Sequence, residues 1–227
     1  LFLDPEKLQE AKPAEVLAAA ARGHLGLANR FLHALVDRRA EALPDVLASA
    51  ARDRSHDVVD LAPELTAIFR YWKALEAIPF YIRLIKEDPE NISDDVTIAL
   101  VDAGAAALEP LLALYAELEE TESGEVAFIL ASLRLRDERI LKILLDRIEF
   151  DLSDTLLLLG IYGDPAARPA IENAALLASG DTELMKEVAD TLGLLGGPKE
   201  PIAEEPFDIW ELYPPEDAPP LDLLDED

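Results

Sequence analysis

A proline recurs in the same local setting at four places in this chain of 227 residues. Each of these prolines follows a run with the apolar spacing of a helix. Each is expected to open another helix, because the N–H groups of a first turn have no intrahelical partners. The prolines are 35, 31 and 59 residues apart, and 59 is close to two units of 29 or 30. A period of this size is typical of stacked supersecondary units. The four residues are Pro44, Pro79, Pro110 and Pro169.

Glycine stands six residues before two of the prolines, at Gly104 and Gly163. A left-handed glycine commonly closes a helix, so each is expected to end the first helix of a pair. Arg38 and Lys73 occupy the equivalent places in the other two segments and lack this signal. The unit without a proline is expected at residues 137–150, where the apolar spacing of a helix continues.

The sequence predicts an all-α protein, because Leu and Ala dominate it and no convincing alternation of apolar and polar residues indicates a strand. Ser93 and Asp181 are expected to cap helices. The expected helices are residues 13–22, 25–38, 41–53, 57–71, 74–87, 93–103, 105–119, 123–134, 137–148, 152–162, 166–178 and 182–195.

The stretch from Leu156 to Ile171, with Gly163 in its middle, resembles HEAT-like repeats, and residues 99–112 resemble them next best. The resemblance covers residues 13–197 and is to the short bacterial form first associated with phycobilin lyases. It implies an armadillo-like, right-handed α-solenoid of about five or six stacked helix pairs. This solenoid would span residues 1–197, with an irregular part up to about residue 55, and an acidic tail would follow at 198–227.

A HEAT-like repeat describes packing and not an activity. It implies a scaffold that binds a protein or peptide on a concave face, without catalytic residues, metal or cofactor. The resemblance to phycobilin lyases leaves open an enzyme or a chromophore-handling protein that acts on a tetrapyrrole.

A third hypothesis is a metal-dependent phosphohydrolase of the HD type, which binds metal through His, His-Asp and a later Asp. The residues that could supply this order are His33, His56, Asp57 and Asp102. A His-Asp pair is also common by chance, and Ser55 with Asp57 makes an ordinary helix start.

The formal charge of −27 is concentrated in the second part of the chain. Residues 1–90 hold 12 Lys and Arg against 15 Asp and Glu, whereas residues 91–227 hold 8 against 32. Phosphate binding depends on Lys and Arg, so we expect neither a nucleic-acid partner nor an anionic membrane surface. No apolar run approaches the ~20 residues of a membrane span.

The chain begins at Leu1, and its single methionine is Met185. We therefore expect that the native start has been trimmed and that a targeting segment could have been removed with it. With no such segment in the sequence, the expected location is the cytoplasm.

The composition changes at Pro198. Residues 200–227 contain eleven acidic side chains and no Lys or Arg, yet an apolar and aromatic cluster interrupts them. Three interpretations stay open: the segment caps the last repeat, it docks on a partner, on this chain's solenoid or on a second copy, or it is disordered. The cluster consists of Phe207, Ile209, Trp210 and Tyr213.

A basic island lies in the acidic part of the chain, at Arg134, Arg136, Arg139 and Lys142, with Arg147 following. One interpretation is a solvated helix face whose cations pair with neighbouring carboxylates. The other is that the island receives the acidic tail or an acidic partner.

Overall fold

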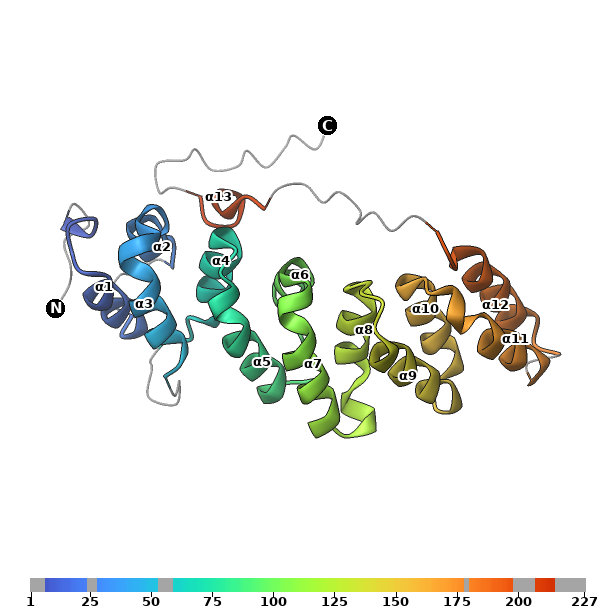
Figure 1. The fold of residues 1–227 in the computed structure, drawn as a ribbon. Coiled ribbons are helices and arrows are strands. Elements are labelled where there is room, and N and C mark those ends of the chain that lie inside the picture. Colours follow the sequence, from blue (N-terminus) through green and yellow to red (C-terminus); the bar gives the residue numbers. More distant parts are fainter. Residues whose placement is uncertain (1–6, 24–27, 53–58, 178–179, 198–206, 215–227) are drawn as a thin grey trace, which may run out of the picture. The chain divides into compact units, whose positions relative to one another are not determined.

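The computed structural model describes residues 7–23, 28–52, 59–177, 180–197 and 207–214. In this part of the chain the regular secondary structure is helical throughout, which confirms the all-α prediction. Figure 1 shows the helices along the chain. They divide into two compact units. The first unit comprises Leu1–Phe80 with Glu205–Asp227, and the second comprises Tyr81–Glu204.

The first unit is built around four helices that bury large apolar side chains. Helix α1 packs on α2 and α3, and α4 packs on both of these. Phe31, Leu32 and Phe69 are completely or almost completely buried between them. The α-helices that begin in this unit are α1 (Pro13–Ala21), α2 (Ala28–Leu35), α3 (Arg39–Ala50), α4 (Ala62–Trp72), α5 (Ile78–Glu87) and α13 (Ile209–Leu212).

In the second unit, α6, α8, α10 and α12 pack against one another in chain order. Helices α7, α9 and α11 follow α6, α8 and α10. Helix α7 contacts α6 and α8, α9 contacts α8 and α10, and α11 contacts α12. Leu100, Ile129 and Leu159 are fully buried in the core of this unit. Its helices are α6 (Asp94–Ala103), α7 (Ala105–Glu117), α8 (Gly124–Ser132), α9 (Glu138–Asp146), α10 (Leu152–Tyr162), α11 (Arg168–Leu177) and α12 (Thr182–Leu194).

A residue with positive φ follows the first helix in four successive pairs, α4–α5, α6–α7, α8–α9 and α10–α11, whereas Arg38, at the equivalent place before α3, has a φ of −109°. The φ angles are 49° at Lys73, 56° at Gly104, 51° at Arg134 and 69° at Gly163. These residues are 31, 30 and 29 positions apart, so the turn at Arg134 supplies the unit expected without a proline. Gly196, after α12, also has a positive φ of 79°. The period of about 30 residues is therefore a property of the backbone and not only of the sequence.

The prediction that each proline opens a helix is correct at two of the four positions. Pro79 and Pro169 are the second residues of α5 and α11, which follow short 3₁₀ turns. Pro44 and Pro110 instead lie six residues into α3 and α7. In these two helices the α-conformation already begins in the turn before the proline. Proline has no backbone N–H, so one hydrogen bond is absent from the interior of each of these helices. In a first turn that N–H would have had no intrahelical partner.

The twelve expected ranges each overlap an α-helix, with ends displaced by up to about five residues. The predicted caps are confirmed: Ser93 Oγ accepts from the N–H of Val96 at 3.4 Å, and Asp181 Oδ1 accepts from the N–H of Glu183 at 3.0 Å. Helix α13 was not predicted. Among the described residues, no helix has both the length and the apolar character needed to cross a bilayer.

Candidate binding site

A single helical turn, α13, forms inside the aromatic cluster of the tail. Asp208 caps it, because its Oδ1 accepts a hydrogen bond from the N–H of Trp210 at 2.9 Å. The N–H of Tyr213 donates to the carbonyl of Ile209 at 3.0 Å and closes the turn. A turn this short is not stable alone in water. Its contacts with the first unit must therefore supply its stability.

Three side chains of the tail lie on α2 and α4 of the first unit. Ile209 is completely buried, and α13 packs against α4 (Figure 1). The ring of Trp210 stacks on His33 of α2, with centroids 4.1 Å apart and planes 19° from parallel. The guanidinium carbon of Arg70 lies 4.2 Å from the centroid of the Phe207 ring, a cation–π arrangement.

Tyr71 completes this surface at 6.5 Å from Trp210, centroid to centroid. We call the surface formed by His33, Arg70 and Tyr71 the tail site. The expectation that the tail caps the last repeat is not met by residues 207–214, because these lie on α2 and α4. Local sequence patterns do not encode a contact between residues so far apart in the chain.

From the sequence, His33 is expected only as a metal ligand of the HD-type hypothesis. In the structure its ring is the platform for Trp210. Within the part of the chain that the structure describes, Nε2 of His33 is buried and has no hydrogen-bond partner. His56 and Asp57 of the HD-type hypothesis lie outside the described residues, and Asp102 is exposed on α6. The described residues contain no group of three His, Asp or Glu side chains that could hold a metal ion.

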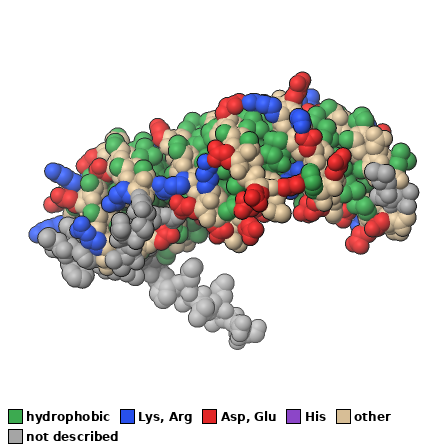
Figure 2. Space-filling view, turned by 90° about the horizontal axis from the view of Figure 1, so that it is seen from below, with side chains coloured by type: hydrophobic (Ala, Val, Ile, Leu, Met, Phe, Trp, Pro, Cys, Tyr) green, Lys and Arg blue, Asp and Glu red, His purple; other side chains and the backbone are tan. Residues whose placement is uncertain are grey.

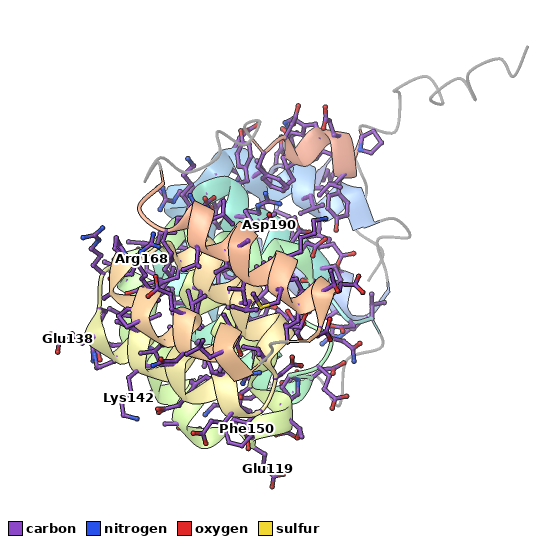
Figure 3. All side chains as sticks on the ribbon, turned by 90° about the vertical axis from the view of Figure 1, so that its right-hand side faces the viewer. Glu119, Glu138, Lys142, Phe150, Arg168 and Asp190 are labelled. Carbon is purple, nitrogen blue, oxygen red and sulfur yellow. The ribbon has the colours of Figure 1, made fainter. Side chains whose placement is uncertain are left out.

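The basic island lies around the turn before α9 and on α9 itself, and neighbouring carboxylates pair with two of its cations. Arg139 donates to Glu109 at 2.7 and 3.0 Å and to Asp137 at 2.8 Å. Lys142, which projects outward from α9, pairs with Asp146 (Figure 3). Arg134 and Arg136 are exposed. The acidic residues that follow Pro214 lie outside the described residues, so the interaction of the island with the acidic tail stays a prediction.

The shifted pKa values in the second unit have structural causes. Hydrogen bonds from Arg139 lower the pKa of Asp137 to about 2 and also lower the pKa of Glu109. Burial raises the pKa of Tyr162, whose hydroxyl binds the backbone of Asp137. These groups form an ion-pair network and a helix contact, and structural networks are a common cause of such shifts.

In the first unit, burial raises the pKa of Glu64 on α4, and the negative charge of Asp60 adds to this effect. The aromatic residues near the end of α4 belong mostly to the core. Trp72 is buried and donates its indole N–H to the carbonyl of Val36 at 2.8 Å. Tyr71 is the exception, because it is 40% exposed beside Trp210.

Comparisons with known proteins add no relative from which a function could be transferred. No protein-family model matches the chain, and neither a curated protein nor a solved structure matches it.

Sequence reasoning identified the tail half of this site, since aromatic residues are unexpected in an acidic, proline-rich segment. It did not identify the helix half. His33, Arg70 and Tyr71 lie on helices whose sequences resemble those of other amphipathic helices, and they come together only through the packing of α2 on α4. The one available signal was Tyr71, an aromatic side chain off the buried stripe of α4.

Proposed function

We propose that this protein is a non-enzymatic helical-repeat scaffold that binds a short aromatic segment of a protein at the tail site. The observation that supports this is the seating of Phe207, Ile209 and Trp210 on α2 and α4. A short helix laid on a helical surface through a few apolar anchors is a recurring mode of peptide recognition.

The recurring positive φ angles support a second part of the proposal, that the helix pairs belong to a right-handed α-solenoid of HEAT-like repeats. Positive φ angles at intervals of 29 to 31 residues agree with helix pairs that repeat with one period. We keep the concave face of that solenoid as a proposed additional binding surface. The number of pairs in this proposal is about five or six.

The expected affinity of the tail site is modest. Burying an isoleucine side chain contributes roughly 1.5–3 kcal/mol, and an aromatic pair adds about 0.5–1.5 kcal/mol. Ordering the peptide backbone opposes both contributions. We therefore expect the Kd of an isolated peptide to lie well above about 1 µM.

The test uses a fluorescent peptide with the sequence of residues 205–214 and the full chain carrying Ile209→Asp. This substitution places a charge where the tail is buried, so it frees the site of its own tail. Fluorescence anisotropy should show saturable binding of the peptide. A matched peptide with Ile209→Asp should not bind. If circular dichroism shows a folded chain and the unmodified peptide does not bind up to about 1 mM, the proposal is wrong.

A further inference from the structure

The tail segment is held as a ligand is held, through side chains on a surface made by other helices. We propose that the tail site takes, from a partner protein, an acidic segment that forms the same capped helical turn. We further propose that the chain's own tail is a competitor that covers the site until such a segment displaces it. This inference rests on the proposed function, since it names the partner and the regulation of the same site.

The contacts of the tail define what a partner segment must present. Asp208 caps the turn, and Ile209 fills the buried position against α4. An aromatic ring at the place of Phe207 lies against the Arg70 guanidinium, and a flat ring at the place of Trp210 lies against His33. The fitting sequence is an aromatic residue, Asp, an aliphatic residue and Trp, in that order.

The part of the chain that carries the tail site opposes an acidic segment less than the second unit does. The part of the first unit formed by residues 1–80 contains 10 Lys and Arg against 12 Asp and Glu, which is close to balance. Residues 205–227 contain nine acidic side chains and no basic one. The second unit holds 10 basic residues against 26 acidic ones, and acidic side chains are prominent on the face seen in Figure 2. An acidic segment is therefore repelled least by the unit that carries the tail site.

The tail is an imperfect occupant of its site. Trp210 stacks on the ring of His33, whose Nε2 is buried and has no hydrogen-bond partner among the described residues. A buried polar atom without a partner disfavours the docked state. Leu212, in the same turn as Ile209, is 53% exposed and contributes little burial. A partner segment that offers a hydrogen bond to His33 would therefore bind better than the tail does.

The experiment measures binding of the fluorescent 205–214 peptide to three full-length chains: the unmodified chain, Ile209→Asp and Leu212→Asp. The two variants add the same charge to the same helical turn, at a buried and at an exposed position. A tethered competitor has an effective concentration on the order of 1 mM. We expect the peptide to bind Ile209→Asp at least tenfold more tightly than the other two chains.

Equal affinity of the peptide for all three chains would contradict competition by the chain's own tail while leaving the proposed function intact. Failure of the peptide to bind the Ile209→Asp chain would contradict both proposals. The affinities of the peptide for the three chains are compared again at chain concentrations of about 1 µM and about 50 µM. A competitor within the chain gives the same ratio of affinities at both concentrations. A ratio that rises with concentration identifies the tail of a second copy as the competitor and contradicts the inference.

The acidic character of the partner is tested with a peptide that carries Asp208→Asn and Glu211→Gln. Asn caps a helix as well as Asp does, so the substitution removes charge and keeps the cap. We expect severalfold weaker binding to the Ile209→Asp chain at 50 mM salt, and a smaller difference at 500 mM salt because the charges are screened. Equal binding of the two peptides at 50 mM salt would overturn the acidic partner class.

Discussion

At the scale of single residues, Lys73 holds a backbone conformation that favours glycine. Its φ and ψ are 49° and 48°, and its side chain is exposed at the end of α4. The left-handed conformation costs an L-residue about 1–2 kcal/mol, and the greater freedom of glycine in the unfolded chain offsets about 0.5–1 kcal/mol of this. Lys73→Gly should therefore stabilise the protein by roughly 0.5–1 kcal/mol in a thermal melt. Lys73→Ala, which keeps the Cβ atom, should bring no such gain, and equal midpoints for the two variants would contradict the explanation.

Asp137 is a residue whose ionisation depends on one partner. Hydrogen bonds from Arg139 lower its pKa from 3.8 to about 2. Because the folded-state pKa lies below the ordinary value, the interaction stabilises the protein above about pH 4, and this contribution is lost as the pH falls toward 2. The contribution is small because the ion pair is exposed to solvent.

An NMR titration should give a midpoint near 2 for the Asp137 carboxyl group, and Arg139→Gln should return it toward 3.8. Lys142→Gln is the matched control, since Lys142 lies on the same helix and pairs with Asp146. A midpoint near 3.8 in the unmodified chain would show that the hydrogen bonds from Arg139 do not persist in solution.

At the scale of helices, the hydroxyl of Tyr162 links the end of α10 to the start of α9. It accepts a hydrogen bond from the N–H of Asp137 at 3.0 Å and lies 3.1 Å from the carbonyl oxygen of the same residue, to which it donates. Tyr162→Phe should lower the free energy of unfolding by about 1–2 kcal/mol, because the N–H of Asp137 loses this partner. The carbonyl of Asp137 loses one of two donors and keeps the N–H of Leu141. Tyr115→Phe, at a half-buried tyrosine of α7, should change it by less. A loss no larger than that of the control would mean that water replaces the hydroxyl.

The helices could be predicted because apolar spacing and caps are local. The turns could be predicted only where glycine marks them, as at Gly104 and Gly163. Lys73 and Arg134 adopt the same positive φ without any signal in their residue type, since the packing of the flanking helices imposes it. The helix start predicted at Pro44 was wrong for a similar reason. Proline restricts a helix but does not fix the residue at which the helix begins.

The tail illustrates a different limit. Helix α13 has four residues and no stability of its own, so helix propensity could not reveal it. Its aromatic residues indicated that the segment is not a purely solvating tail, but its place depends on His33 and Arg70, which are more than a hundred residues away in the chain. Composition therefore drew attention to residues 207–213, and only the tertiary packing could identify the surface on which they lie.

At the scale of the whole molecule, the two tryptophans allow the two units to be followed separately. Trp72 and Trp210 both belong to the first unit, and the second unit contains none. Fluorescence therefore reports the unfolding of the first unit, whereas circular dichroism reports the helices of both. In a chain that ends at Gly197, Trp72 is the sole remaining tryptophan.

Removing the tail uncovers the apolar surface against which Ile209 is buried, and it also removes the stacking on His33. Ordering the tail costs conformational entropy, which offsets part of this stabilisation. We therefore expect the free energy of unfolding to fall by about 1 kcal/mol, which lowers the melting midpoint of a unit of this size by roughly 4–8 °C. The fluorescence midpoint should fall by this amount in the chain that ends at Gly197. The dichroism transition that Tyr162→Phe lowers belongs to the second unit and should not move. An unchanged fluorescence midpoint would mean that the docked tail adds no stability to the first unit. A shift of both transitions would instead mean that the tail stabilises the two units together.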